Sequence, residues 1–280
     1  MSDNLNLVQL SQRDGKAIMA LTALIGWDLG RPDWEAILAC GPVFGHKHED
    51  GSLHSTAAIF PSGPSCAVIG AVMVHPDHRR QGLGAQVVQK CLGLLAKESS
   101  AHLVSTPVGD KLYEQLGFKT IGETLHLEID GAALSCAEEL PAIRVRDLVN
   151  VVKLDATAFG GQRYGLLKRR ISQSDKSAVI EDDAGQTIAF ALAVPRPDAL
   201  QIGPIIAPDC QSALRLVNFL AAGHPGTIRL IVPASQSDFL EQLKQLGFKE
   251  GRRSLVKSLD AKPLPGLRAN YMALDSHCFC

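Results

Sequence analysis

The spacing of apolar side chains predicts strands and helices that alternate along the chain. A short strand covers residues 5–10, and two helices follow, at 14–25 and from Asp33 to Cys40. Further strands are predicted at 42–48, 54–60, 65–74, 102–106, 118–121 and 123–129. The strand at 65–74 has no polar alternation after Cys66, so we expect it to be buried on both faces.

A helix is predicted from Gly82 to Glu98. Its apolar residues recur at helical spacing, at Leu83, Val87, Cys91 and Leu94. A second helix is predicted at 109–116, and Gly117 fits its C-terminal cap.

The same order of elements returns in the second half, which indicates an internal duplication. Val74-His-Pro-Asp77 has a counterpart in Ile206-Ala-Pro-Asp209, and Leu116-Gly-Phe-Lys119 has one in Leu246-Gly-Phe-Lys249. We therefore predict a first domain at 1–130, a connector at 131–142, a second domain at 143–262 and a tail at 263–280. The second domain is expected to open with a strand at 143–146.

Composition agrees with a two-domain globular protein. The chain has 280 residues, of which 46% are hydrophobic and 20% charged, and its formal net charge is −1. This charge lacks the basic excess typical of nucleic-acid binders. The longest apolar run, Cys66 to Val74, falls short of the about 20 residues that a membrane-spanning helix needs. We expect no nucleic-acid partner and no membrane association.

The cysteines favour a reducing compartment. There are seven of them, scattered along the chain, which argues against a disulfide framework. Cys278 and Cys280 lie close together, but no second Cys or His pair is near them, so we predict no metal site. The start of the sequence lacks the pattern of a signal peptide, and we expect a cytoplasmic protein.

The chemically informative stretch joins the strand at 65–74 to the next helix. Gly82 and Gly84 lead into that helix, where glycine lets the backbone approach a ligand. The free N–H groups of a first helical turn suit an anion such as a pyrophosphate, and Arg79 and Arg80 add positive charge. A plain strand-to-helix turn would also use such glycines. Neither of the common nucleotide-binding glycine patterns is present, because position 87 is Val and no Gly-Lys-Ser/Thr follows.

Two motifs resemble those of the GNAT superfamily of N-acetyltransferases. Arg79-x-x-Gly82-x-Gly84 resembles the acetyl-coenzyme A loop of that family, and Leu112-Tyr-Glu-Gln-Leu-Gly-Phe118 resembles its second signature. The likeness covers residues 5 to 130, and the second half resembles a degenerate GNAT-like domain. The resemblance implies an α/β (α+β) fold of two such domains. Each would be a mixed, mostly antiparallel twisted sheet flanked by helices.

The resemblance also implies roles for individual residues. Met73 and Val74 would hold the acetyl carbonyl and the pantetheine through backbone groups. The loop would hold the pyrophosphate of acetyl-CoA through Arg79, Arg80, Gln81, Gly82, Leu83, Gly84 and Ala85. Tyr113 would protonate the departing thiolate, since a phenol with a pKa near 10 stays protonated at neutral pH. Alternatively, Tyr113 is a packing residue on an amphipathic helix.

The residue that takes the proton from the acceptor is less defined, because the strand at 65–74 has no carboxylate. Trp27 and Asp28 lie in a loop that lines the acceptor site in the family, so Asp28 is a candidate base or acceptor contact. His54 is a candidate substrate-binding residue, and His54 and His75 are further candidates for the base. An isolated Asp in a loop is often only a turn or cap residue, and an isolated His is often at the surface or in a satisfied core.

The second half lacks the chemical groups of the first. Asp209 leads directly into a helix without a Gly-x-Gly pattern, and Leu243 stands where Tyr113 would align. We expect this half to shape the acceptor site or to act as a structural partner.

The sequence thus predicts transfer of an acetyl group from acetyl-CoA to a primary amine of a small molecule or peptide. The transfer would occur by direct attack in a ternary complex, in a monomer or homodimer. The alternatives are a CoA-responsive binding module without turnover and an interaction protein of two inactive domains. The intact loop argues against the last.

Overall fold

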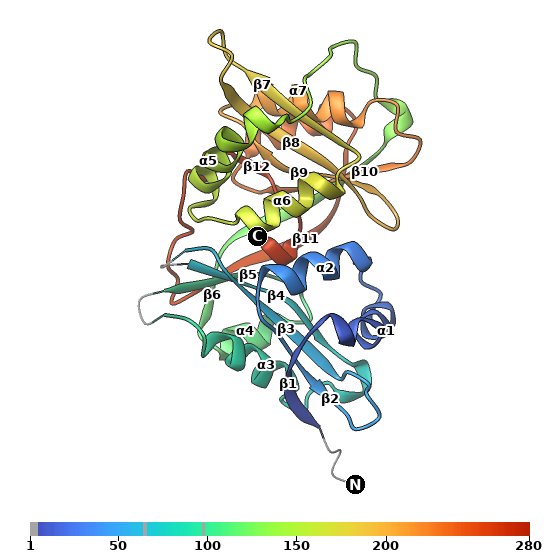
Figure 1. The fold of residues 1–280 in the computed structure, drawn as a ribbon, viewed down its shortest axis with the longest axis vertical. Coiled ribbons are helices and arrows are strands. Elements are labelled where there is room, and N and C mark those ends of the chain that lie inside the picture. The colour runs from blue at the N-terminus through green and yellow to red at the C-terminus, as the bar shows by residue number, and fades with distance from the viewer. Residues whose placement is uncertain (1–4, 64–65, 97–98) are drawn as a thin grey trace.

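A computed structural model of the chain describes residues 5–63, 66–96 and 99–280. These residues form two lobes stacked along the long axis of the molecule (Figure 1). The first lobe contains β1 (Asn6–Leu10), α1 (Gly15–Ile25), α2 (Arg31–Cys40), β2 (Val43–Lys47), β3 (Ser55–Pro61), β4 (Cys66–Val74), α3 (Leu83–Leu92), β5 (Ser100–Ser105) and α4 (Asp110–Gln115). The second contains α5 (Leu148–Phe159), α6 (Tyr164–Gln173), β7 (Lys176–Glu181), β8 (Thr187–Pro195), β9 (Leu200–Ile206), α7 (Cys210–Ala221), β10 (Thr227–Pro233) and α8 (Ser237–Gln245).

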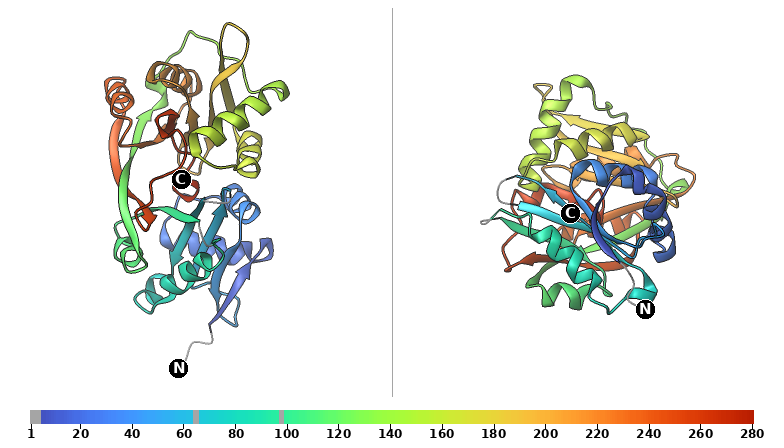
Figure 2. Two further views of the ribbon diagram at one scale, coloured as in Figure 1. Left: turned by 90° about the vertical axis from the view of Figure 1, so that its left-hand side faces the viewer. Right: turned by 60° about the horizontal axis from the view of Figure 1, so that its bottom comes forward.

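Two long strands belong to both lobes. They are β6 (Phe118–Asp130) and β11 (Lys249–Leu259), and they lie in the middle of one continuous sheet. Among the described residues its order is β1-β2-β3-β4-β5-β11-β6-β10-β9-β8-β7, with β12 (Tyr271–Ala273) pairing with β9. Figure 2 shows both strands running side by side from one lobe into the other.

The register shows that the lobes exchange strands. Residues 255–258 of β11 pair with β5 of the first lobe, and residues 124–130 of β6 pair with β10 of the second. The strand pairing therefore does not follow a boundary at residue 130. Each lobe's part of the sheet contains one strand from the other half of the chain, β11 in the first lobe and β6 in the second. Neither part is complete without both halves of the chain.

A buried ion pair fixes the exchanged strand of the first lobe. Lys257 on β11 is fully buried, and its Nζ lies 2.6 Å from Oδ1 of Asp110 and 3.6 Å from Oε1 of Glu114. Both carboxylates belong to α4. A buried lysine is tolerated because these carboxylates and the Thr120 hydroxyl, at 3.1 Å, satisfy it. The second half of the chain is thereby attached to the helix that carries Tyr113.

Most predicted elements lie within a few residues of the observed ones, and the mixed, mostly antiparallel sheet with flanking helices is confirmed. Three differences matter. The predicted strands 118–121 and 123–129 are one strand, because the chain passes straight into the other lobe instead of turning back. Residues 143–146 form no strand and lead into a short 3-10 helix at Val145–Asp147. Helix α3 ends at Leu92, which leaves Leu94 half exposed.

Parts of two predictions lie outside the described residues. They are residue 65 of the strand predicted at 65–74 and residues 97–98 at the end of the predicted 82–98 helix.

The chain's last residues pack between the lobes. Residues 277–279 form a 3-10 helix near β4, and the C-terminus lies at the centre of the molecule (Figure 1). A Cβ on Gly70 would lie 2.4 Å from the carbonyl oxygen of Cys278, so the tail backbone contacts β4 directly. Two buried ion pairs hold the tail from the second lobe: Arg170 donates to Asp275 at 3.0 Å, and Arg196 lies 3.4 Å from the same carboxylate.

Candidate active site

The first turn of α3 presents free backbone donors. Gly82 precedes the helix with φ of 84°, a left-handed conformation that glycine adopts without strain. The first bond of the helix joins the Gln86 N–H to the Gly82 carbonyl at 3.1 Å. The N–H groups of residues 83–85 are therefore not used by the helix, and Gly82 has no side chain that could cap them.

The second glycine of the motif has a packing role. A Cβ on Gly84 would lie 3.1 Å from Leu112 and 3.3 Å from Val74. Gly84 is buried where α3 meets α4 and β4, so its small size is explained by this close contact. Gly82 has open space around it and is required by its backbone conformation. Glycine is thus required at the two positions for different reasons: at position 82 by the backbone conformation, and at position 84 by close packing.

The strands beside this loop diverge. β4 pairs with β5 in parallel only through residues 66–68, although β4 continues to Val74 and β5 to Ser105. Ala71 has a left-handed φ of 52°, and the register against β3 shifts at the same place, which marks a bulge in β4. Met73 lies beyond the bulge and is buried, and Val74 ends the strand partly exposed. The divergence of β4 from β5 opens the sheet next to the N-terminus of α3, where Gly84 lies against Val74.

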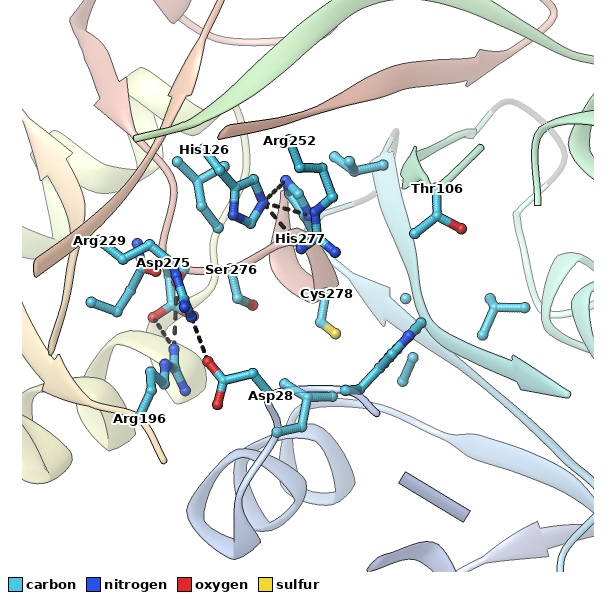
Figure 3. A pocket seen from close by; sticks show the side chains of 18 of the residues that line it. Asp28, Thr106, His126, Arg196, Arg229, Arg252, Asp275, Ser276, His277 and Cys278 are labelled. Atoms are coloured by element: carbon cyan, nitrogen blue, oxygen red, sulfur yellow. Dashed lines mark hydrogen bonds and ion pairs between the residues drawn. The ribbon is translucent and has the colours of Figure 1, made fainter. Parts of the chain in front are cut away.

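A cavity of about 460 Å³ lies at this opening, between the two lobes (Figure 3). We call it the central cavity. The first lobe lines it with the loop after α1, the bulged part of β4, the end of β5 and Tyr113. The second half of the chain lines it with β10, the loop between β8 and β9, β11 and the tail. Its polar side chains include Asp28, His126, Glu128, Arg196, Asp198, Arg229, Arg252 and His277.

Tyr113 reaches the central cavity from α4. Its ring is almost fully buried and packs edge-on against Phe118 with centroids 6.0 Å apart. Gly109 makes room for it, since a Cβ there would lie 2.9 Å from the ring. Burial raises the pKa of the Tyr113 hydroxyl well above its usual value, and the nearby Cys278 thiol adds to the shift. The phenol is therefore protonated at neutral pH.

The loop after α1 brings Trp27 and Asp28 to the central cavity. Gly26 ends the helix in a left-handed conformation, and the N–H groups of Gly26 and Trp27 donate back to Ala23 and Thr22 at 3.1 and 3.2 Å. The indole of Trp34 on α2 donates to the Thr22 hydroxyl at 2.9 Å, which fixes α2 against α1. These contacts fix the direction in which the loop leaves α1, and they thereby place Trp27 and Asp28 at the central cavity.

Asp28 belongs to a group of three carboxylates around one guanidinium. Arg229 on β10 contacts Asp28 at 2.5 Å, Glu128 at 2.7 Å and Asp198 at 3.0 Å. We call Asp28, Glu128 and Asp198 the carboxylate cluster. With Arg229 included, its formal charge is −2 when all three are ionised. Burial raises the pKa of Asp28, and the adjacent Asp198 raises it further, which moves this carboxyl towards the range of a general base. Its Oδ1 is buried and has no hydrogen-bond partner among the described residues.

Two neutral histidines lie at another side of the cavity. His126 Nε2 is 3.3 Å from His277 Nε2, and the latter is 3.1 Å from the Thr124 hydroxyl. Burial lowers the pKa of His126 to about 3 and that of His277 well below its usual value. Arg252 donates to His126 Nε2 at 3.3 Å, so this nitrogen is an acceptor and the ring carries its proton on Nδ1.

The structure places the predicted residues in three groups. Trp27, Asp28 and Tyr113 line the central cavity. Met73, Val74 and the residues from Arg79 to Ala85 continue from β4 into α3, with Arg79, Arg80 and Gln81 exposed. His54 and His75 are not among the residues that line the cavity. The His54 ring stacks on His78 with centroids 3.9 Å apart, and His75 adjoins both, beside the loop.

Sequence reasoning missed the polar residues that β6 and the second half of the chain bring to the cavity. β6 supplies His126 and Glu128. The second half supplies Arg196, Asp198, Arg229, Arg252, Asp275 and His277, among others. The ion pair between Asp28 and Arg229 joins residues 201 positions apart. Nothing local to either residue signals the other.

Known proteins share this fold and sequence. The family description "Acetyltransferase (GNAT) domain" matches twice, at residues 43–120 and 151–269. An uncharacterized N-acetyltransferase of Bacillus subtilis, YitH, is 30% identical over 246 residues, which cover 86% of this chain and 87% of that protein. The mycothiol acetyltransferase of Mycolicibacterium vanbaalenii is 21% identical over 234 residues, covering 72% and 77% of the two chains.

Solved structures show the same tandem architecture. A proposed acetyltransferase of Pyrococcus horikoshii superposes with a TM-score of 0.83 at 17% identity, covering 100% of this chain and 97% of that one. A tandem GNAT protein from the clavulanic acid biosynthesis pathway has a TM-score of 0.66 at 16% identity, covering 93% and 99%. The fold and the sequence matches define an acyltransferase enzyme. The chain belongs to the GNAT family and is a tandem GNAT N-acetyltransferase.

No helix among the described residues is both long enough and apolar enough to span a membrane.

Proposed function

We propose that the chain transfers the acetyl group of acetyl-CoA to a primary amine in a ternary complex at the central cavity. GNAT enzymes use acetyl-CoA as co-substrate, and three features of the first lobe suit it. They are the uncapped N-terminus of α3, the divergence of β4 from β5, and Tyr113 at the cavity that the divergence opens. The observation that carries the proposal is that the uncapped N-terminus of α3 packs, at Gly84, against the helix whose Tyr113 lines the central cavity.

The chain's own residues would divide the work as follows. The N–H groups of residues 83–85 would bind the pyrophosphate, assisted by the positive end of the α3 dipole. When bound, acetyl-CoA supplies a thioester carbonyl that an amine attacks directly, which leaves a thiolate. Tyr113 would donate its proton to that thiolate. Asp28 would hold the acceptor ammonium and take its proton, because its raised pKa improves it as a base.

The second lobe would contribute the acceptor side of the site. The second lobe supplies Arg196, Asp198 and Arg229 to the central cavity, and the exchanged strand β11 supplies Arg252. The carboxylate cluster would attract a cationic amine, since it exceeds Arg229 in charge. A single active site per chain follows, with cofactor contacts from the first lobe and acceptor contacts from both.

The test is release of free CoA thiol from acetyl-CoA by the intact chain, measured against a panel of amino acids, polyamines, aminoglycosides and short peptides. We expect thiol release with at least one amine and acetylation of that amine by mass spectrometry. A thermal shift with acetyl-CoA, without thiol release for any amine, would contradict turnover and favour a CoA-responsive binding module.

A further inference from the structure

Three arginines line the central cavity, and only one of them lacks a carboxylate partner. Arg196 is paired with the buried carboxylates of Asp33 and Asp275, and Arg229 is paired with the carboxylate cluster. Arg252 forms no ion pair with any residue that the structure describes. Within the described part of the chain, its hydrogen bond goes to the neutral ring of His126.

The backbone of β11 directs Arg252 to this place. Glu250 is opposite Leu127 and Arg253 is opposite Leu125, so Gly251 and Arg252 together face the single residue His126. This is a β-bulge, a feature that turns a side chain out of the regular alternation of a strand. The adjacent Arg253 points elsewhere, to Glu250 at 2.6 Å and Glu123 at 3.5 Å. Figure 3 shows the Arg252 side chain beside the rings of His126 and His277.

The surroundings of Arg252 do not neutralise its charge. Burial lowers the pKa of Arg252, and the nearby Arg229 lowers it further, while Glu128 opposes this. The two histidines beside it are neutral, as their lowered pKa values show. A guanidinium so placed gains most from an anionic oxygen group, which it binds with two parallel hydrogen bonds.

Arg252 is exposed to solvent, and the central cavity carries charge of both signs that the ion pairs among the described residues do not balance. The carboxylate cluster has an excess of negative charge, and Oδ1 of Asp28 is buried without a hydrogen-bond partner among the described residues. Arg252 supplies the positive charge from a different strand. A ligand with an ammonium and an anionic group on one small skeleton matches both. The volume of about 460 Å³ is sufficient for a molecule of that size.

We infer that the acceptor is an amine that also carries a carboxylate, held by Arg252, with its ammonium at Asp28. This rests on the proposed acetyl transfer and names its substrate class. Arg252 is a specificity-determining residue in this arrangement. It binds the part of the acceptor that does not react. Loss of Arg252 would therefore raise KM for such acceptors and leave the chemical step at the amine nearly unchanged.

The experiment compares matched acceptors that differ by one charge. The probes are the twenty common L-amino acids, their α-carboxamides, and phosphoethanolamine as a phosphate-bearing amine. Thiol release is measured for the wild-type chain, for Arg252→Gln and for the control Arg253→Gln. Glutamine keeps a polar N–H donor and removes the positive charge and the forked donor geometry. Arg253 is the neighbouring arginine with its own carboxylate partners outside the cavity.

We expect at least one amino acid to be preferred over its carboxamide by about 10-fold or more in kcat/KM, the usual value of a charge-assisted hydrogen bond. Arg252→Gln should remove this preference, mainly through KM. Arg253→Gln should keep it. Equal rates for acids and carboxamides in the wild type, or a preference that survives Arg252→Gln, would overturn the inference while acetyl transfer itself stands.

Two further outcomes decide the remaining cases. Preference for phosphoethanolamine over every amino acid, lost in Arg252→Gln, would replace the carboxylate by a phosphate and overturn the inference as stated. If no probe releases thiol, the proposed function fails for this panel, and calorimetric titration of the same acids into the complex with CoA decides the binding question. Binding of an acid that Arg252→Gln weakens about 10-fold or more supports the inference, and absence of binding overturns it.

Discussion

The two lobes differ most at the N-terminus of one helix. In the first lobe, α3 begins after Gly82, which has no side chain to cap it. In the second lobe, α7 begins after Asp209, whose carboxylate accepts from the Ser212 N–H at 2.8 Å and from the Ser212 hydroxyl at 3.1 Å. A carboxylate at this position satisfies the helix end that an anionic ligand would otherwise satisfy. The residue before the helix thus decides whether its N-terminus is capped by the chain itself or left open, as the proposed cofactor site requires.

The opening between two parallel strands also differs between the lobes: it is filled in the second lobe and hollow in the first. β9 and β10 pair in parallel only through two residues of each strand and then diverge, as β4 and β5 do. In the second lobe the chain's own tail fills the opening. β12 pairs with β9, and the Leu274 N–H donates to the Ile231 carbonyl at 2.8 Å. The first lobe keeps the central cavity at the corresponding place.

Tyr113 and its counterpart in the second lobe complete the comparison. Tyr113 lines the central cavity, whereas Leu243, its counterpart, is fully buried in the core of the second lobe. The second lobe therefore has the fold without the open helix N-terminus and the tyrosine on which the proposed function depends. What it retains at the cavity is charge, from Arg229, Asp198 and the arginine on the exchanged strand.

Separating the lobes should have the largest effect. A fragment of residues 1–135 lacks β11, so β5 and β6 would each lose their neighbour, and Asp110 would lose Lys257. We expect the fragment to be unfolded or aggregated by circular dichroism and size-exclusion chromatography, and to have no thiol-releasing activity. Co-expression with residues 136–280 should restore a soluble complex. A monomeric, folded and active fragment would show that the exchanged strand is dispensable.

Replacing the tyrosine tests the chemical difference between the lobes. Tyr113→Phe removes the proton donor and keeps the ring, so kcat should fall by about 10² or more, the usual contribution of a general acid. Affinity for acetyl-CoA should change little. Tyr164→Phe, at an exposed tyrosine of α6, is the control and should retain full activity. A kcat within twofold of wild type would remove Tyr113 from the proposed role.

Exchanging the helix caps tests the difference between α3 and α7. Gly82→Asp gives α3 the carboxylate that α7 has, and aspartate tolerates left-handed φ better than most residues. We expect acetyl-CoA affinity to fall by about 10-fold or more, because the carboxylate takes the backbone donors and repels the pyrophosphate. Asp209→Gly should lower stability by only about a few tenths of a kcal/mol, because glycine is itself tolerated at an N-cap, and it should create no second site, since the tail still fills the second lobe. Unchanged affinity in a folded Gly82→Asp variant would exclude the α3 site.

The last prediction concerns the pH dependence of stability, through a histidine of the central cavity. His126 has a folded-state pKa of about 3, against an ordinary value of 6.5. The unfolded chain therefore binds a proton between these values that the folded chain excludes, so stability falls as pH drops below 6.5. For His126 alone the loss is about 2 kcal/mol at pH 5. Arg252, which contacts this ring, and the nearby Arg229 disfavour its protonation, and His277 faces the same ring. His126→Asn should flatten the decline in melting temperature between pH 7 and 5, and an unchanged slope would contradict the assignment.

The sequence predicted what is local. The strand, turn and helix around Gly82 form as expected because their signals lie in one continuous stretch of the chain. Tyr113 lies on α4, which ends at Gln115, and Gly117 follows it in a left-handed conformation, as a C-terminal cap requires. The exchange of β6 and β11 was not predictable in this way. Residues 118–129 show the same alternation whether the chain turns back or continues, and only the pairing with a strand more than a hundred residues away decides.

The acceptor side was missed for the same reason. Asp28 was singled out by its place in a loop, but its partner Arg229 is defined only by the fold. Arg252 faces the cavity because of a bulge in β11 that the residue sequence alone does not specify. Tail residues such as His277 reach the site by crossing both lobes.

Calorimetric titration of acetyl-CoA into the intact chain tests the central claim most directly. The account requires one functional cofactor site, at the N-terminus of α3, and a second lobe whose corresponding site is closed by Asp209 and β12. It predicts a stoichiometry of one acetyl-CoA per chain, with binding weakened in Gly82→Asp and retained in Asp209→Gly. Two acetyl-CoA molecules per chain, or binding that Gly82→Asp leaves intact, would contradict it.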